Sequence, residues 1–386
     1  MTSEKDQKER SGSWARPLVL GIETSCDDTA CALVDGAGRV LTSVVSSQLA
    51  AHRPFGGVVP EIASREHLKS WPLVSREALA RAGVGFGDLD VVAATRGPGL
   101  VGSLLVGLSL GKALAYALDK PFHAVHHLAG HLYSPFLEPP GNGAPSGGAE
   151  AAPERFTGLV LSGGHTALFA VDGEKPTTLG ETRDDAIGEV FDKVGKRLGL
   201  PYPQGPRVDV LAEHGDPEAH PLPVPTCGDS LDFSYSGLKS QALVEIQRLE
   251  QRGVDTDLAT VDPATAELPD GSRVAQEVLD LLAGFRRAAV DEVLDRCRRL
   301  HRERLDRGRP LELLAVSGGA AANRLLRREL TAWAENEALE LRLVPLAYSG
   351  DNAAMIAYAA LLRQRRGISD DPRNAEAASR VPLTGS

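Results

Sequence analysis

The sequence predicts an α/β protein built from two related halves, and three features of the 386-residue chain lead to this prediction. Short apolar runs rich in Val, Ile and Leu alternate with longer segments of helical periodicity. The alternation occurs in two successive series along the chain. In both series glycine-rich turns follow strand-like runs, which is typical of sheets covered by helices.

The first series contains four predicted strands and two predicted helices. The strands cover 18–22, 31–35, 40–48 and 90–95, and the helices cover about 62–82 and 99–118. The second helix approaches the length of about 20 apolar residues that spans a bilayer. Its many Gly, Ser and Ala residues, together with Lys112, instead favour a helix that is buried and closely packed in a protein. The sequence therefore predicts no membrane segment.

The second series has the same character. Its predicted strands cover 157–164, 167–172 and 312–319, and its predicted helices cover 184–199, 236–252 and 273–303. A further helix is expected after the last strand. Repetition of one pattern in both halves of the chain predicts two domains of related architecture.

We predict a first domain that spans 17–121 and is completed by about 346–367, and a second domain that spans 122–345. Four further segments are polar or dense in Gly and Pro, and we expect them to be loose, namely 1–16, 138–155, 254–272 and 368–386. Of these, 1–16 is a predicted disordered tail and 138–155 a predicted flexible insertion.

Composition indicates a cytoplasmic protein. The four cysteines form no CxxC pair, and the first sixteen residues are polar where a signal peptide needs an apolar run.

The formal net charge of −10 argues against a chain that binds nucleic acid unaided, because phosphate contacts need clustered Lys and Arg. Seven arginines between 286 and 304 form either a basic strip for such contacts or, with the interleaved acids, a solvated face.

A histidine pair in the segment HHLAGHLYSPF suggests a metal site. His127 and His131 are four positions apart, so both rings lie on one face of a helix and can converge on one ion. The alternative is a capping or hydrogen-bonded surface pair. A zinc protease of the HExxH type needs a Glu after the first His, but Leu128 stands there. Asp351 is a candidate third ligand, although its position before a predicted helix also suits an N-cap.

Glycine-rich turns follow strands at four places, namely 20–30, 95–103, 161–167 and 316–326. Because glycine has no Cβ atom, the backbone N–H groups of such a turn can approach a phosphate. No Walker GxxxxGK[ST] segment occurs. The arrangement resembles the actin-like ATPase, sugar-kinase and Hsp70 superfamily, in which two related domains hold a nucleotide in the cleft between them.

Nine motifs resemble those of one family, and they run in order from about residue 18 to about 365. They are GIETSCDDTA, GGVVPEIASREH, TRGPGLVGSLLVG, HHLAGH, LSGGHTALF, DDAIGEVFDKVGKRLGLPYPQGP, DFSYSGLKS, SGGAAANRLLR and DNAAMIAYA. On these motifs the chain is similar to the TsaD family, the tRNA N6-adenosine threonylcarbamoyltransferases, formerly described as O-sialoglycoprotein endopeptidases.

This resemblance implies an activity. The family transfers a threonylcarbamoyl group from threonylcarbamoyl-adenylate to N6 of adenosine 37 in tRNAs that read ANN codons, and AMP leaves. It also implies two protein partners in bacteria, TsaB, which is related to TsaD in fold, and the small ATPase TsaE.

The resemblance further implies site residues. His127, His131 and Asp351 would hold one divalent metal ion, iron(II), with zinc as the alternative. The donor would be bound by two sets, namely Val160, Leu161, Ser162, Gly163 and Gly164 in the turn, and Asp192, Gly205, Asp209 and Asn323 beyond it. Two positions depart from the family pattern: Asp28 stands where a Glu is usual, and Gln204 stands where a Gly is usual.

The sequence favours three other functions less. A metalloprotease lacks the general base after His127. A carbamoyltransferase for a small molecule is suggested by related proteins, but the chain has no extra domain for it. A nucleotide-gated scaffold of the actin type leaves the histidine pair without a use.

Overall fold

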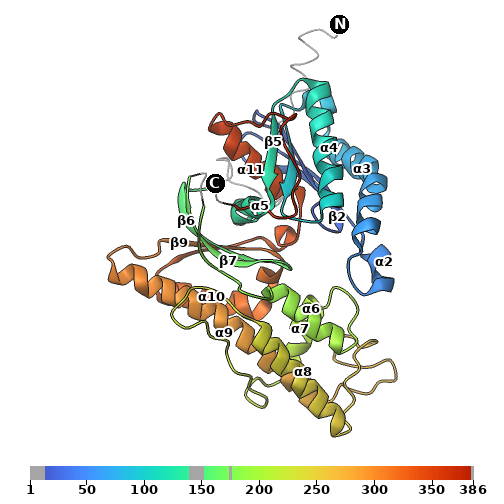
Figure 1. The fold of residues 1–386 in the computed structure, drawn as a ribbon, viewed down its shortest axis with the longest axis vertical. Helices are drawn as coiled ribbons and strands as arrows, with labels where there is room; N and C mark the ends of the chain where they lie inside the picture. The colour runs from blue at the N-terminus through green and yellow to red at the C-terminus, as the bar shows by residue number, and fades with distance from the viewer. Residues whose placement is uncertain (1–13, 139–151, 174–175, 384–386) are drawn as a thin grey trace. The chain divides into compact units, whose positions relative to one another are not determined.

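A computed structural model describes residues 14–138, 152–173 and 176–383 (Figure 1). The chain divides into two compact units. Unit 1 comprises Met1–His52, Val58–Pro153 and Val344–Ser386, and unit 2 comprises Arg53–Gly57 and Glu154–Leu343.

Unit 1 contains a mixed sheet of five strands in the order β3-β2-β1-β4-β5. The strands are β1 Val19–Glu23, β2 Asp28–Val34, β3 Val40–Ser47, β4 Val91–Gly97 and β5 Phe122–His126. The first three strands pair antiparallel, and β1, β4 and β5 pair parallel. The residues of β1 are fully buried, which explains the continuous apolar run VLGI.

Helices cover both faces of this sheet. They are α3 Pro60–Ala82, α4 Val101–Leu118 and α11 Ala353–Arg365. Gly21 faces α11, because a Cβ added there would lie 2.3 Å from the Ala353 carbonyl oxygen, whereas Gly111 of α4 packs against Ile22 and Ala94. Since neighbouring residues of a strand point to opposite faces, α11 and α4 lie on opposite sides of the sheet.

Unit 2 repeats this topology. Its sheet has the order β10-β9-β6-β7-β8, with antiparallel pairing among β6, β7 and β8 and parallel pairing among β6, β9 and β10. The strands are β6 Arg155–Leu161, β7 Thr166–Asp172, β8 Thr177–Glu181, β9 Leu313–Ser317 and β10 Glu340–Leu343. In each unit the first strand is central, with two antiparallel strands on one side and two parallel strands on the other. The prediction of two related halves is confirmed.

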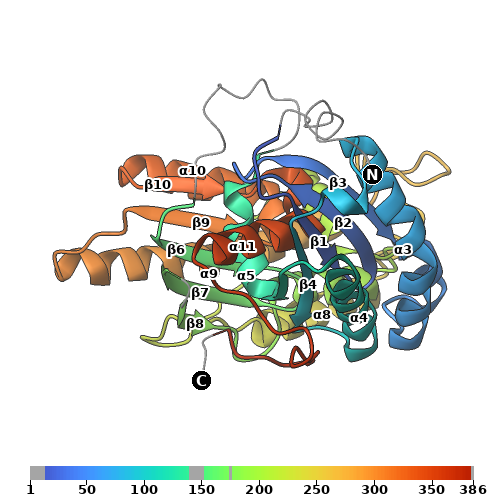
Figure 2. The ribbon, with the colours of Figure 1, turned by 90° about the horizontal axis from the view of Figure 1, so that it is seen from above.

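Figure 1 labels the helices of unit 2, and Figure 2 shows α8, α9 and α10 from a second direction. Helix α9 is the longest of those described. They are α6 Ile187–Arg197, α7 Gly205–Leu211, α8 Ser236–Gln251, α9 Gln276–Asp306 and α10 Arg324–Asn336. In α9, 18 of the 31 residues are buried, so it forms much of the core of this unit.

Two predicted boundaries are wrong. Residues 122–153 belong to unit 1, because β5 continues its sheet in parallel register with β4, with Ala93 opposite His123. The predicted loose tail after residue 367 is instead held against unit 1 over its described part. Ala378 N–H donates to the Arg96 carbonyl at 3.0 Å, and Lys112 Nζ donates to the Ala375 carbonyl at 2.9 Å. Residues 1–13 and 139–151, where two of the loose segments were expected, lie outside the described residues.

Helix α4 is long and apolar enough to cross a membrane by length and composition alone, and it is the one such helix among those described. Its small residues face the sheet of unit 1. A Cβ added at Gly107 would lie 2.3 Å from Thr24 Oγ1, and one added at Gly111 would lie 2.9 Å from Ala94 Cβ. The expected close packing is confirmed at these glycines, but the expectation of a buried helix is wrong for most of its length, because only six of its 18 residues are buried.

Candidate functional site

The histidine pair lies on a short helix of unit 1. Strand β5 ends at His126, and α5 (His127–Tyr133) begins with the next residue. His126 caps the helix, because its Nδ1 accepts a hydrogen bond from Leu128 N–H at 3.1 Å. His127 and His131 lie one turn apart, with ring centroids separated by 4.7 Å, and both side chains are buried. The alternative of an exposed surface pair is wrong.

Asp351 lies in the loop before α11. The expected N-cap role belongs to its neighbour, because Asn352 Oδ1 accepts a hydrogen bond from Met355 N–H at 3.0 Å. The Asp351 carboxylate is therefore available to the histidines. Gly130 lets α11 come close to α5, since a Cβ added there would lie 3.0 Å from atoms of Met355 and Ile356.

Three ligand atoms converge at this point. Asp351 Oδ1 lies 3.4 Å from His127 Nε2 and 3.2 Å from His131 Nε2, and the potential ligand atoms of the three residues all lie within 4.8 Å of one another. Atoms bound about 2.1 Å from one ion, at angles near those of tetrahedral or octahedral sites, lie about 3.0–3.4 Å apart. The two distances from Asp351 Oδ1 match this spacing, as expected for ligands of one divalent transition-metal ion.

A buried glutamate also holds His127 in place. Glu23, at the end of β1, is fully buried, and its Oε2 accepts hydrogen bonds from His127 Nδ1 at 3.1 Å and from Thr95 Oγ1 at 2.6 Å. Its other oxygen accepts from Ser25 N–H. Because a carboxylate only accepts, Nδ1 of His127 carries a proton and Nε2 is directed toward Asp351. The sequence analysis missed this residue, although a lone carboxylate that ends a buried strand is a usable signal.

The electrostatics of this group favour a cation. Burial alone would lower the pKa of His127, but the carboxylates of Asp351 and Glu23 raise it to about 10. Burial acts to raise the pKa of Asp351, yet His127 and His131 hold it well below its usual value. The fully buried carboxylate of Glu23 and the partly buried carboxylate of Asp351 thus favour positive charge between them, which a proton or a metal ion supplies.

The turn between β1 and β2 carries another unusual carboxyl group. Burial raises the pKa of Asp28 to about 7, and the charges of Asp27 and Asp351 act in the same direction. Among the described residues, Asp28 Oδ1 has no hydrogen-bond partner. The turn is held by His67 of α3, whose Nε2 donates to the Cys26 carbonyl at 3.0 Å. Asp28 is therefore a carboxyl group that changes charge near neutral pH.

The predicted donor-binding residues all lie in unit 2. Val160 and Leu161 are buried in β6, and Ser162 begins the turn to β7, with His165 N–H donating to Ser162 Oγ at 3.1 Å. Gly163 and Gly164 have open space where a Cβ would be, so no described protein atom requires glycine there.

Asp192 and Gly205 meet directly. Asp192 Oδ1 accepts hydrogen bonds from Gly205 N–H at 2.7 Å and from Gln204 N–H at 2.9 Å, at the start of α7. Gln204 has ordinary helical φ and ψ, and it packs over Gly195, where an added Cβ would lie 2.6 Å from Gln204 Cβ. The turn therefore accepts Gln204 in place of the usual glycine.

Asp209 and Asn323 also come together. Asp209 Oδ2 accepts a hydrogen bond from the N–H of Arg324, the residue after Asn323, at 3.1 Å. Asn323 caps α10, since its Oδ1 accepts from Leu326 N–H at 2.9 Å. Arg286, expected from the sequence to lie in a basic strip or a solvated face, instead holds Asp209 from α9.

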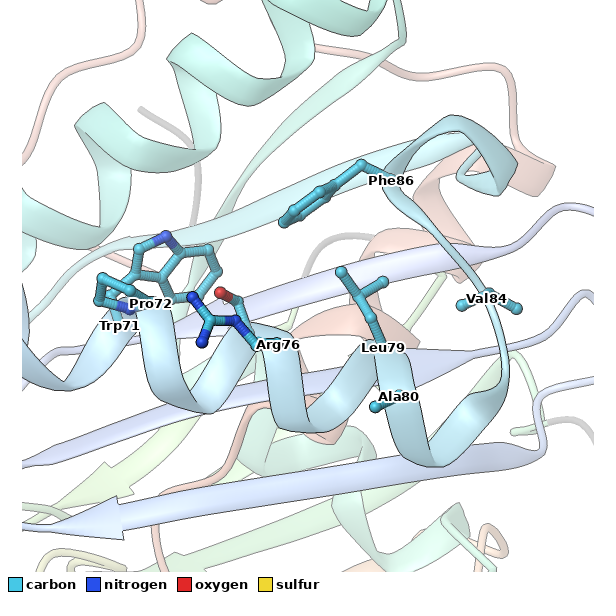
Figure 3. Close-up of a pocket in the computed structure, with 8 residues that line it drawn as sticks. Trp71, Pro72, Arg76, Leu79, Ala80, Val84 and Phe86 are labelled. Atoms are coloured by element: carbon cyan, nitrogen blue, oxygen red, sulfur yellow. The ribbon is translucent and has the colours of Figure 1, made fainter.

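A groove runs along the second half of α3 in unit 1 (Figure 3). It is lined by Trp71, Pro72, Ser75, Arg76, Leu79, Ala80, Val84 and Phe86. Phe86 points from the segment after the helix toward Trp71 and Arg76. The groove shares no residue with the histidine and aspartate triad, so it is a separate feature of the surface.

Comparison with known proteins places the chain in a family. The family model of TsaD, described as tRNA N6-adenosine threonylcarbamoyltransferase, matches residues 39–358. Proteins of that name from Pelobacter propionicus and Thermus thermophilus are 48% and 44% identical. The first alignment covers 88% of this chain and 90% of the relative, and the second covers 95% and 98%.

A solved structure shares the fold. HypF from T. kodakarensis is 14% identical, with a TM-score of 0.54 over 92% of this chain and 48% of that chain. At this identity the likeness shows the fold alone. Together with the repeated topology of the two sheets, it identifies the actin-like ATPase and sugar-kinase fold. By the family match and the identity of its relatives, the chain belongs to the TsaD family, the tRNA N6-adenosine threonylcarbamoyltransferases.

Proposed function

We propose that this chain transfers the threonylcarbamoyl group of threonylcarbamoyl-adenylate to N6 of adenosine 37 in tRNAs that read ANN codons. The amine nitrogen bonds to the carbamoyl carbon, the bond from that carbon to the phosphate oxygen breaks, and AMP leaves. The observation that carries the proposal is the family match over 39–358. The convergence of His127, His131 and Asp351 in unit 1 supports it.

We assign one divalent metal ion, iron(II) or alternatively zinc, to His127, His131 and Asp351. When bound, such an ion supplies positive charge that stabilises negative charge on phosphate or carbamoyl oxygens of the donor. Glu23 fixes the ring of His127, so that Nε2 rather than Nδ1 is presented. A protease is not favoured, because the position of its general base is taken by the buried, apolar Leu128.

We assign donor binding to unit 2. The open space beside Gly163 and Gly164 supports phosphate binding at their backbone N–H groups. Asp192 and Asp209 are placed on α6 and α7, and carboxylates suit the ribose hydroxyls. Asn323 completes the set at the start of α10.

Asp28 is our candidate for accepting the proton that N6 loses. A general base works best when its pKa is near the working pH, and the pKa of Asp28 is about 7. Because a carboxyl group is ionised above its pKa, the transfer rate should rise with pH up to about 7 and then level off. Asp28→Asn should remove this rise and lower kcat by about 100-fold or more. Steady-state rates between pH 5.5 and 8.5 measure both effects.

Asp27→Asn is the matched control, since it makes the same change at the adjacent residue. It should keep the pH dependence of the wild type. If Asp28→Asn keeps the rise and Asp27→Asn loses it, Asp27 is the base instead.

The tRNA must be bound by an acidic chain, and one end of α9 suits this task. Seven arginines were expected to form a strip or a solvated face. Arg286 and Arg296 are buried, so both interpretations are wrong for these two. From 298 to 309 the chain has six arginines and two acidic residues, a formal charge of +4. Four of these arginines are exposed and, within the described part of the chain, have no carboxylate within 4.0 Å; they are Arg298, Arg302, Arg307 and Arg309.

The turn after α9 holds these side chains together. Gly308 adopts a left-handed conformation with φ of 66°, and Arg309 N–H donates to the Arg304 carbonyl at 2.9 Å. The chain therefore reverses, and Arg307 and Arg309 stay beside the last turn of α9. We propose that TsaB and TsaE act with this chain in the cytoplasm and help to recruit the tRNA.

Reversing two of these charges should weaken tRNA binding. Arg302→Glu with Arg307→Glu should raise the KM for tRNA by about 10-fold or more at 50 mM salt, and should lower the slope of log K against log salt by about 2. The KM for the donor should not change. The control, Arg65→Glu with Arg273→Glu, makes the same charge change at two exposed arginines elsewhere. If both double variants raise the KM for tRNA equally, only the net charge of the chain matters. That result would contradict the proposal that tRNA binds at this end of α9.

The proposed function is tested by incubating unmodified ANN-decoding tRNA with the full chain, its partners and purified threonylcarbamoyl-adenylate. Mass spectrometry of the nucleosides should detect threonylcarbamoyladenosine, together with one AMP per modified tRNA. With partners known to be active, failure to form the product would overturn the proposal.

A further inference from the structure

The side chain of Arg286 holds Asp209 from the neighbouring helix. Arg286 lies in α9 and is only 6% exposed. Its Nη1 donates to the Asp209 carbonyl at 2.9 Å and to Asp209 Oδ1 at 3.2 Å, and it also contacts the Glu213 carboxylate. Its Nη2 donates to the Ala212 carbonyl at 3.2 Å. One guanidinium thus ties α7 and the turn after it to the core of unit 2.

Helix α7 is short, with seven residues, whereas α9 has 31 residues and is largely buried. A buried guanidinium must be paired, and its planar fork fixes the direction of each hydrogen bond. The other carboxylate oxygen of Asp209 accepts from Arg324 N–H at 3.1 Å. The Asp209 side chain is therefore held at both oxygens, one from α9 and one from α10.

This arrangement leaves Asp209 with a defined capacity to bind a ligand. A carboxylate has about four lone-pair sites, two on each oxygen. Arg286 occupies one site on Oδ1 and Arg324 N–H occupies one on Oδ2. One site on each oxygen remains, which matches two neighbouring hydroxyl donors, the pattern of a vicinal diol such as the 2′ and 3′ hydroxyls of a ribose.

We infer that Arg286 is a positioning residue that orients the Asp209 carboxylate to accept both ribose hydroxyls of the adenylate donor. The inference rests on the proposed function, because that function gives Asp209 its ligand. Arg286 itself does not touch the donor. It sets the affinity for the ribose through Asp209, and it also neutralises the charge that Asp209 and Glu213 would otherwise place side by side.

The neighbouring Arg287 provides a matched control. It lies on the same helix and also pairs with two carboxylates, Asp291 and Glu329, but it makes no hydrogen bond or ion pair with Asp209 among those of the described residues. Lys and Met variants are made at both positions. Comparing them distinguishes the loss of the ion pair between Arg286 and Asp209 from the loss of any other ion pair of α9.

The test uses the full chain and measures binding of AMP and of 2′-deoxy-AMP by calorimetry, together with the KM for the donor and kcat in the complete transfer reaction. Arg286→Met should weaken AMP binding and raise the donor KM by about 10-fold or more, because an oriented hydrogen bond to a charged group is lost. At saturating donor kcat should change less than twofold, and the KM for tRNA should not change. Arg286→Lys keeps the charge without the fork and should recover part of the affinity. Both Arg287 variants should bind AMP as the wild type does.

The comparison of the two nucleotides separates positioning from folding. The wild type should prefer AMP to 2′-deoxy-AMP by about 10-fold, and this preference should be reduced in Arg286→Met. If Arg286→Met melts at a lower temperature but binds both nucleotides as the wild type does, Arg286 is only structural and the inference is overturned. If Arg286→Met does not fold, Arg286→Lys gives the same test. A wild-type chain that shows no preference for AMP also overturns it. Failure of the proposed function is recognised separately, since the wild type then forms no threonylcarbamoyladenosine.

Discussion

Replacing Asp351 by alanine is expected to reduce the bound metal to background and to lower the transfer rate by about 100-fold or more. Asp351 is the one anionic member of the triad, and its Oδ1 lies within 3.4 Å of both histidine Nε2 atoms. Loss of a residue that only hydrogen-bonds a metal ligand lowers metal affinity or activity by about 10- to 100-fold. Loss of a ligand itself should lower them at least as much. Elemental analysis of the purified variant and its transfer rate measure the two effects.

Asp371→Ala is the control for this variant. Asp371 is a carboxylate of the same unit that pairs with Arg373 at the surface, away from the triad. It should retain metal and activity. An Asp351→Ala protein that keeps one ion per chain would show that the ion is held elsewhere.

Replacing Glu23 by glutamine is expected to weaken metal binding by about 10- to 100-fold while the chain stays folded. Glutamine preserves the shape of the buried side chain but has one donor group in place of an acceptor. Its amide would meet either Ser25 N–H or the donors His127 Nδ1 and Thr95 Oγ1, so one hydrogen bond of the group is lost. Competition with a chelator of known affinity measures the change.

A second buried glutamate gives the matched control. Glu292 in α9 is fully buried and accepts from Ser234 N–H at 2.9 Å, and it belongs to unit 2. Glu292→Gln should leave the metal affinity unchanged. Equal losses in both variants would mean that Glu23 acts through general stability, and an unchanged affinity in Glu23→Gln would remove its positioning role.

Much of the fold follows from local pattern. The alternation of apolar runs and helical periodicity predicts two related α/β halves, because each run is long enough to define its element. Strand β5 was missed because FHAVH has only five residues and contains two histidines. Its place in the sheet depends on pairing with β4, which is a tertiary contact. The placement of the chain after residue 367 also depends on tertiary contacts. No apolar periodicity in this segment predicts its hydrogen bonds with Arg96 and Lys112.

The histidine pair could be predicted from spacing, because residues i and i+4 share a helical face whatever the rest of the fold does. Its surroundings could not. Glu23 and His127 are 104 positions apart in the chain, so only the parallel arrangement of β1, β4 and β5 brings them together. In the same way, the sequence alone does not distinguish Arg286 from the other charged residues of its helix. Only its burial against Asp209 in the structure distinguishes it from Arg287.

The most direct test of this account is an anaerobic titration of the metal-free full chain with iron(II), with zinc in a parallel series. Bound metal and threonylcarbamoyladenosine in ANN-decoding tRNA are measured at each step. The account predicts that product formation rises with bound metal until one ion is held per chain and is then constant, and that Asp351→Ala forms little product throughout. Full transfer by the metal-free chain would contradict the central claim that His127, His131 and Asp351 act by holding a metal ion.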